Sequence, residues 1–193
     1  MGTRPASRRR QALLFARNFL KHPRMLGSVI PSSRFLIREL VAEIDWRRAR
    51  VLVEYGPGVG NITAELLRRM PPDAVLFVFE TNADFVGHLR RSLRDPRLHV
   101  VHGSAEEADA VLARHGRPRA DYVVSGIPFS TIPPAARESI LRRTRGLLHP
   151  DGKFLVYQFS GAVLPHLVRT FRHVRKDFEP LNILPARLFY CTP

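Results

Sequence analysis

The segment most suited to chemistry is 51–60. In it Glu54 follows a short apolar run, and glycines stand at positions 56, 58 and 60. An apolar run that ends in a glycine-rich turn is typical of a buried strand leading into a nucleotide-binding loop. A loop built for phosphate groups presents backbone N–H groups and positive charge. A carboxylate at Glu54 would repel a pyrophosphate but would suit a cationic group, such as the ammonium group of a bound amino acid.

Three more short motifs follow later apolar runs. Glu80 ends the second run, 24 residues after Gly56, where a carboxylate can accept hydrogen bonds from both hydroxyl groups of a ribose. Ser104 and Ala105 follow the third run, and the segment 125–129 (Ser-Gly-Ile-Pro-Phe) ends the fourth. Because open α/β sheets bind ligands at the carboxyl ends of their strands, we expect the four motifs to form one site. The spacing G-x-G-x-x-G of a plain NAD site is not met.

The elements that must position these motifs alternate between apolar runs and helical patterns. Strands are expected at 51–55, 75–80, 98–102, 121–125 and 153–159, and helices near 60–70, 83–94, 105–114 and 133–147. This alternation predicts a parallel sheet with helices on both faces. Two extended segments, 173–183 and 186–191, are expected to form an antiparallel pair at the sheet edge. Ahead of the first strand we expect helices at about 7–21 and 32–44, the second capped by Ser32 or Ser33.

The charge of the chain is strongly positive, with a formal net charge of +14 over 193 residues. Nine basic residues precede the first acidic one, Glu39, and such a field favours an anionic surface: nucleic acid or an acidic membrane leaflet. Helix 7–21 is basic and amphipathic, as interfacial helices are, although it also suits a mitochondrial transit peptide. No apolar stretch approaches the ~20 residues of a membrane span. The single cysteine, Cys191, allows neither a disulfide within the chain nor a cysteine-based metal site, and we expect no metal.

The four motifs resemble those of the class I S-adenosylmethionine-dependent methyltransferases. The resemblance implies an α/β, Rossmann-like fold with a seven-stranded, mostly parallel sheet, an antiparallel final strand and N-terminal helices. It also implies S-adenosylmethionine as the cofactor. Glu54 would lie near the amino group of the cofactor or hold the loop through hydrogen bonds, and Glu80 would bind the ribose. The other cofactor-binding residues that it implies are Gly56, Pro57, Gly58, Gly60, Thr81, Ser104, Ala105 and Ser125.

Two branches of this class share the sequence motif Glu-x-Gly-Pro-Gly, which is found here at residues 54–58. The ribosomal RNA adenine dimethylases carry an Asn before Leu/Ile-Pro-Tyr/Phe, but Gly126 holds that position here, and the chain stops at 193 without room for their C-terminal RNA-binding domain. The bacterial phospholipid N-methyltransferases resemble this chain also at 27–36, 125–128 and 182–187. This second resemblance implies methyl transfer to the amino headgroup of phosphatidylethanolamine or its methylated derivatives. The residues 129–131 (Phe-Ser-Thr) are less apolar than expected for that branch.

On this interpretation the backbone carbonyls of Ser125, Gly126 and Ile127 orient the amine, and Tyr157 either shapes the amine pocket or is a core tyrosine. No general base is assigned. Arg34 is a candidate for a lipid phosphate, and His22 and Arg24 would lie beside the headgroup entrance.

Residues 1–45 would form a basic membrane or substrate lid, and 46–193 the methyltransferase domain. The expected partners are an anionic membrane surface and its phospholipid substrate. The protein is expected in the cytoplasm, peripherally associated with the inner face of the membrane. The alternatives are an RNA adenine N6-methyltransferase, a small-molecule methyltransferase and a non-catalytic protein that binds membrane or RNA.

Overall fold

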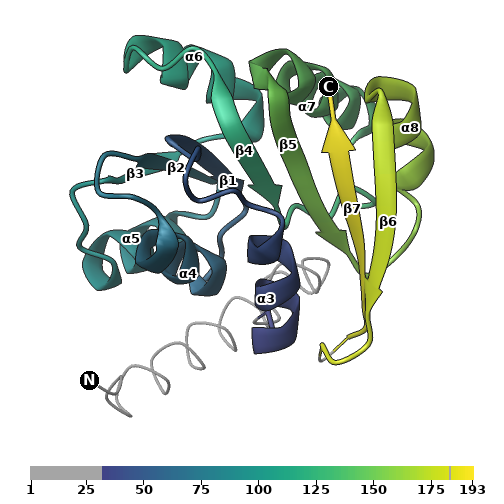
Figure 1. Cartoon of the computed structure of the whole chain (residues 1–193), viewed down its shortest axis with the longest axis horizontal. Helices are drawn as coiled ribbons and strands as arrows, with labels where there is room; N and C mark the ends of the chain where they lie inside the picture. Colours follow the sequence, from purple (N-terminus) through teal and green to yellow (C-terminus); the bar gives the residue numbers. More distant parts are fainter. Residues whose placement is uncertain (1–31, 183) are drawn as a thin grey trace.

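A central sheet with helices on both faces organises the part of the chain that the computed structural model describes, residues 32–182 and 184–193 (Figure 1). Its strands are β1 (Val51–Tyr55), β2 (Val75–Glu80), β3 (Leu98–His102), β4 (Ala120–Ser125), β5 (Leu148–Gln158), β6 (His173–Glu179) and β7 (Ala186–Thr192). They are arranged in the order β3-β2-β1-β4-β5-β7-β6, and β7 runs antiparallel to both of its neighbours. The predicted α/β fold with a mostly parallel, seven-stranded sheet is confirmed. The predicted helix 7–21, with His22 and Arg24, lies outside the described residues.

The helices form two layers because successive side chains of a strand point to opposite faces of the sheet. In β1, Leu52 packs in one hydrophobic cluster and Val51 and Val53 pack in the other. The helices are α3 (Arg34–Ala42), α4 (Asn61–Arg69), α5 (Ala83–Ser92), the 3₁₀ turn η2 (Ala105–Glu107), α6 (Ala108–Arg114), α7 (Pro134–Leu147) and α8 (Leu164–Thr170). The cluster of Leu52 includes α3, α4 and α5, whereas η2, α6, α7 and α8 contribute to the other.

The sequence predicted most element boundaries closely, with four main differences. The ranges of β1, β2 and β3 coincide with the predicted strands, whereas β5 begins at Leu148, five residues earlier than expected. The predicted extended segment 173–183 is too long, because β6 ends at Glu179 and a turn follows it. The predicted helix 105–114 begins as the 3₁₀ turn η2. Helix α8 was not predicted, because seven residues are too few to display a helical period. The last two strands do pair antiparallel, with β7 inserted beside β5 and β6 at the outside.

Helix α3 is attached to the rest of the fold at its first turn. Ser33 is the N-cap, and its side chain accepts a hydrogen bond from the Leu36 N–H at 3.2 Å. The Ser33 N–H donates to the side-chain oxygen of Asn182, in the turn after β6, at 2.8 Å. Leu36 and Leu40 are fully buried in the cluster that also contains Leu52. Whether the chain divides at residue 45 stays a prediction.

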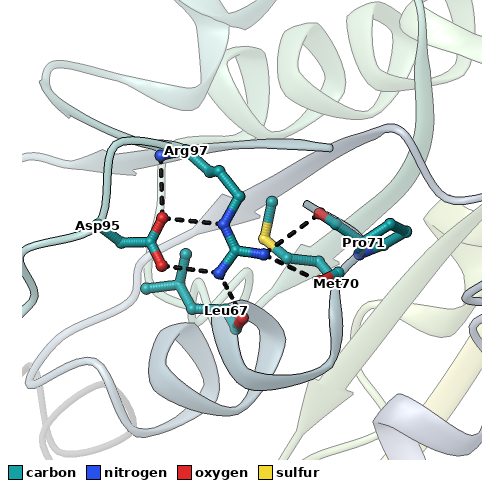
Figure 2. Close-up of polar contacts among 5 residues, drawn as sticks. All are labelled: Leu67, Met70, Pro71, Asp95 and Arg97. Carbon is teal, nitrogen blue, oxygen red and sulfur yellow. Dashed lines mark hydrogen bonds and ion pairs between the residues drawn. The ribbon is translucent and has the colours of Figure 1, made fainter. Parts of the chain in front are cut away.

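Arg97 holds the carboxyl end of α4, as Figure 2 shows. Its guanidinium group donates to the backbone carbonyls of Leu67 at 2.8 Å, Met70 at 2.9 Å and Pro71 at 3.2 Å. Asp95 accepts two further hydrogen bonds from the same group, at 2.9 and 2.7 Å. The last carbonyls of a helix have no partner within it, so these bonds complete the hydrogen bonding of α4 at the end away from the glycine loop.

Candidate active site

The glycine loop runs from the end of β1 into α4, and each of its glycines has a positive φ: 68° at Gly56, 56° at Gly58 and 83° at Gly60. This is the left-handed region that side chains other than glycine rarely adopt. A Cβ atom at Gly60 would also lie 2.6 Å from the side chain of Leu89 in α5. The loop therefore needs its glycines, and it brings backbone N–H groups to the carboxyl edge of the sheet.

Glu54 is buried beneath this loop, with 2% of its surface exposed. The hydroxyl group of Thr63, in α4, donates to its carboxyl group at 2.6 Å. Burial raises the pKa of Glu54 from 4.5 to about 8, and the nearby Glu80 adds to the increase, whereas the Thr63 bond opposes it. The structure thus shows Glu54 joining β1 to α4. A cationic group close to this carboxyl would lower its pKa again.

Glu80 ends β2 next to the same loop. One of its carboxyl oxygens accepts from the Gly58 N–H at 3.2 Å and the other from the Asn82 N–H at 2.9 Å. Burial raises the pKa of Glu80, and the backbone hydrogen bonds only partly counteract it. Gly58 and Glu80, two residues that the sequence assigned to one site, are therefore in direct contact. Thr81 is exposed, and its carbonyl oxygen lies 3.2 Å from the His102 ring.

Ser104 and Ala105 lie beyond the end of β3, and the preceding Gly103 N–H donates to the Glu80 carbonyl at 3.1 Å. The Ser104 hydroxyl group accepts from the Glu106 N–H at 3.2 Å, and the Ser104 N–H donates to the Glu107 carboxylate at 2.8 Å. The Ser104 side chain also accepts from the Glu107 N–H, and this bond and the one to the Glu107 carboxylate form a capping box at the start of the 3₁₀ turn η2. Ser104 thus has a capping role in addition to its predicted place beside the cofactor, and Ala105 is buried.

The segment from Ser125 to Phe129 leaves β4 beside the glycine loop, and its Gly126 N–H donates to the Tyr55 carbonyl at 2.9 Å. Gln158, at the end of β5, holds this segment by its side-chain amide. Its Nε2 donates to the Ile127 carbonyl at 2.7 Å, and its Oε1 accepts from the Phe129 N–H at 3.2 Å. The Ile127 carbonyl thus already accepts one hydrogen bond and has a second lone pair; its predicted contact with the amine stays a prediction.

The Tyr157 side chain lies so close to Gly126 that a larger residue at position 126 would collide with it. A Cβ atom at Gly126 would lie 2.2 Å from the Tyr157 hydroxyl oxygen and 3.2 Å from the Gly56 carbonyl oxygen. The Tyr157 hydroxyl group also hydrogen-bonds the side chain of Ser32, and burial raises its pKa to about 12, helped by Glu54 and Glu80. The tyrosine is half-buried and packs against the core cluster on that face, and its hydroxyl group lies beside Gly126. Whether it shapes an amine pocket stays a prediction.

No role at this site was predicted for Thr63, Gln158 or Asn182, and Ser32 was predicted only as a possible helix cap. Each forms a hydrogen bond across a long stretch of chain or between two elements, and their sequence neighbours give no sign of the partner. For Gln158 a signal did exist, because it is a polar residue in an otherwise apolar run that ends at the ligand edge of the sheet.

Arg34 lies apart from these contacts, exposed on α3 with its guanidinium carbon 4.8 Å from the centre of the Phe35 ring. It lines a groove of about 630 Å³ between α3 and α4, together with Arg38, Arg68 and Arg69. Within residues 32–182 and 184–193 no group of three His, Cys, Asp or Glu side chains is arranged to hold a metal ion. A helix long and apolar enough to cross a membrane is also lacking in this part of the chain.

Comparisons with known proteins agree with this geometry. Ornithine lipid N-methyltransferase of Singulisphaera acidiphila is 34% identical over 180 residues, which cover 92% of this chain and 94% of that protein. Ribosomal RNA small subunit methyltransferase A of Laribacter hongkongensis is 33% identical over 100 residues, which cover 52% of this chain and 36% of that protein's length. The crystal structure of 1,6-didemethyltoxoflavin-N1-methyltransferase of Burkholderia thailandensis, with bound 1,6-didemethyltoxoflavin and S-adenosylhomocysteine, matches with a TM-score of 0.61 at 18% identity, and the match covers 100% of this chain and 92% of that one. No family model matches the chain.

The strand order, with its antiparallel β7, and the glycine loop after β1 define a class I S-adenosylmethionine-dependent methyltransferase. Within this class the chain belongs to the bacterial lipid N-methyltransferases, as its likeness to the Singulisphaera enzyme over nearly the full length of both proteins shows. The predicted family, enzyme class and cofactor are confirmed.

Proposed function

We propose that this enzyme transfers a methyl group from S-adenosylmethionine to the amino headgroup of a membrane lipid, namely phosphatidylethanolamine or its methylated derivatives. The contact between Gly126 and Tyr157 carries the choice of acceptor. At position 126 the RNA-modifying branch has an Asn that holds the adenine amine, but here the Tyr157 hydroxyl group fills the space of any such side chain. This favours a small aliphatic amine over a nucleobase, in agreement with the lipid relative.

The residues around the glycine loop fit the cofactor that the family uses. When bound, S-adenosylmethionine supplies an electrophilic methyl carbon attached to a sulfonium sulfur. The amino group of its methionine portion would lie near Glu54, whose pKa is raised chiefly by burial and which such a cation would stabilise in its charged form. The carboxyl group of Glu80 accepts backbone hydrogen bonds from Gly58, Thr81 and Asn82, and its two oxygens have further lone pairs that could accept a ribose hydroxyl group. Ala105 and the capped Ser104 would border the adenine ring.

On the acceptor side the amine must attack in its neutral form, and an alkylammonium with a pKa of ~10 is mostly protonated at neutral pH. Transfer from water into the site would lower that pKa. The Ser125 and Gly126 carbonyls are the proposed acceptors for the amine hydrogens, and Gln158 keeps their segment in position. With its pKa near 12, Tyr157 stays protonated and acts as a neutral hydrogen-bonding wall of the amine pocket. The contribution of these residues is alignment of the amine with the methyl carbon.

The charge of the chain supports action at an anionic membrane surface. The formal net charge is +14, and each basic residue near an anionic leaflet contributes roughly 1 kcal/mol to binding. Arg34 is exposed and shares its groove with three other arginines, so it remains the proposed contact for a lipid phosphate. We propose peripheral association with the inner face of the cytoplasmic membrane.

The test is methyl transfer from labelled S-adenosylmethionine to vesicles that contain phosphatidylethanolamine, to vesicles that contain ornithine lipid, and to bulk ribosomal RNA. We expect label in phosphatidylethanolamine. If only ornithine lipid is labelled, the proposed headgroup is wrong, but a lipid amine is still the methyl acceptor. Label in RNA and in neither lipid would overturn the proposal and favour the adenine-methylating alternative.

A further inference from the structure

The end of β6 and the turn that follows it (residues 178–182 and 184, together called the β6–β7 turn below) expose several apolar side chains. Phe178 is 53% exposed, Leu181 61% and Leu184 41%, and these three lie within seven residues of one another. In residues 32–182 and 184–193 the one other large apolar side chain with comparable exposure is Val168 in α8, at 59%. Single exposed apolar residues are ordinary, but a cluster of them marks a binding surface.

The conformation of this segment exposes its apolar side chains and buries its polar ones. Glu179 and Asn182 are both 7% exposed. Glu179 accepts from the Leu181 N–H at 2.6 Å, and the side-chain amide of Asn182 donates to the Leu184 carbonyl at 2.8 Å. Asn182 also accepts from the Ser33 N–H of the α3 cap. These bonds fix the turn and leave its apolar side chains toward solvent.

The turn lies at the same edge of the sheet as the candidate active site. Strands β5 and β6 are both antiparallel to β7, so β6 points in the direction of β5 and of the other parallel strands. Its carboxyl end therefore projects from the edge that carries Glu54, Glu80 and Ser125. Figure 1 shows this turn extending past the sheet beside α3. The chain also connects the two places, since Ser33 bonds Asn182 and the neighbouring Ser32 bonds Tyr157.

The charges around the apolar cluster are mostly positive. The guanidinium carbon of Arg187 lies 6.0 Å from the centre of the Phe178 ring, and Lys176 is exposed two residues before Phe178 on the same face of β6. Of the acidic neighbours, Glu179 is buried, and Asp177 pairs with Arg175 at 3.6 Å. Apolar side chains bordered by cations match the boundary between acyl chains and anionic headgroups.

We propose that the β6–β7 turn is a membrane anchor: Phe178, Leu181 and Leu184 enter the headgroup region of an anionic bilayer, while Lys176 and Arg187 contact lipid phosphates. This anchor would direct the opening of the active site toward the leaflet that contains the substrate. The inference rests on the proposed lipid substrate, and it assigns membrane binding to a segment far in sequence from the basic N-terminal region.

The experiment compares full-length variants in flotation with vesicles of phosphatidylglycerol and phosphatidylethanolamine. The test variant carries Phe178→Ser, Leu181→Ser and Leu184→Ser, and the matched control carries Val168→Ser, which removes an equally exposed apolar side chain away from the turn. We expect vesicle binding of the triple variant to weaken roughly tenfold or more, and that of the control to stay within about twofold of wild type. Calorimetric binding of S-adenosylhomocysteine should be unchanged in both.

Equal vesicle binding by the triple variant and wild type overturns the anchor, and so does the absence of vesicle binding by wild type. If the triple variant loses cofactor binding, Leu181→Ser alone replaces it, with a loss of vesicle binding of about threefold expected and no loss refuting the anchor. Methyl transfer to short-chain phosphatidylethanolamine in detergent separates the two proposals, because it does not require a bilayer. There the triple variant should match wild type, whereas failure of wild type to methylate this lipid would count against the proposed function.

Discussion

The contact between Gly126 and Tyr157 predicts a large effect of the smallest possible substitution, Gly126→Ala. The new Cβ atom would lie 2.2 Å from the Tyr157 hydroxyl oxygen and 2.8 Å from the adjacent ring carbon, against an ordinary contact of 3.4 Å or more. The tyrosine must therefore move by more than an ångström. It cannot move freely, because its hydroxyl group bonds Ser32 and its ring packs in the core. Overpacking of this kind costs about 1–3 kcal/mol, and loss of the Ser32 bond adds about 1 kcal/mol.

In a protein of this size each 1 kcal/mol lowers the melting temperature by roughly 2–4 °C, so thermal unfolding should show a loss of several degrees. Methyl transfer should fall about tenfold or more, since the acceptor pocket is displaced. The matched control is Gly146→Ala in α7, where a Cβ atom meets nothing within 4 Å and alanine should stabilise the helix by up to about 1 kcal/mol.

A double-mutant cycle isolates the contact. Tyr157→Phe removes the nearest atom, so it should lessen the cost of Gly126→Ala by about 1 kcal/mol relative to the sum of the single changes. Wild-type stability and activity of Gly126→Ala, or additivity of the two changes, would refute the interpretation that Tyr157 fills the acceptor side of position 126.

Four further predictions concern the surroundings of the site. Because the pKa of Glu54 is raised from 4.5 to about 8, the folded apoprotein keeps a proton that the unfolded chain has released, and its free energy of unfolding should fall as the pH rises from about 4.5 to 8. Glu54→Gln should remove most of this decrease, roughly 1–3 kcal/mol in urea titrations at pH 5 and 8, and an unchanged decrease would contradict the assignment. Glu80→Ala should weaken S-adenosylhomocysteine binding more than about tenfold in calorimetry, since the Gly58 N–H and the ribose both lose their acceptor; unchanged affinity would mean that the ribose contact is misassigned. Gln158→Ala should lower kcat about tenfold with unchanged cofactor affinity, because it releases the segment 127–129; weaker cofactor binding would argue for a different role. Arg97→Lys should cost about 2 kcal/mol of stability in thermal unfolding, since lysine cannot reach all the carbonyls at the end of α4, whereas Arg94→Lys on the exposed surface should cost nothing measurable and an equal cost would refute the role of Arg97.

Local chemistry allowed several parts of the protein to be predicted from the sequence. Strands β1 and β2 are buried, and buried parallel strands must be apolar on both faces, so their ranges could be predicted to the residue. The range of β3, a half-buried edge strand, was also predicted correctly. Glycines are favoured where φ is positive, so the tight loop at 56–60 could also be predicted from the sequence. Helix α8 was not predicted, because seven residues are too few to show a helical period. The start of β5 was not predicted, because Pro150 and Gly152 interrupt its apolar pattern.

The sequence by itself determined the class of fold, the edge of the sheet at which the four motifs meet and the residue types found there, because these depend on residues close together in the chain. Tertiary structure alone decided what each polar group bonds. Glu80 proved to hold Gly58, and Gln158 proved to hold the segment that follows β4. Position 126 requires glycine because the hydroxyl group of Tyr157, 31 residues further along the chain, occupies the space of a side chain. The apolar turn at 178–184 likewise gains its meaning only from the sheet, since the direction of β6 places it beside the active site.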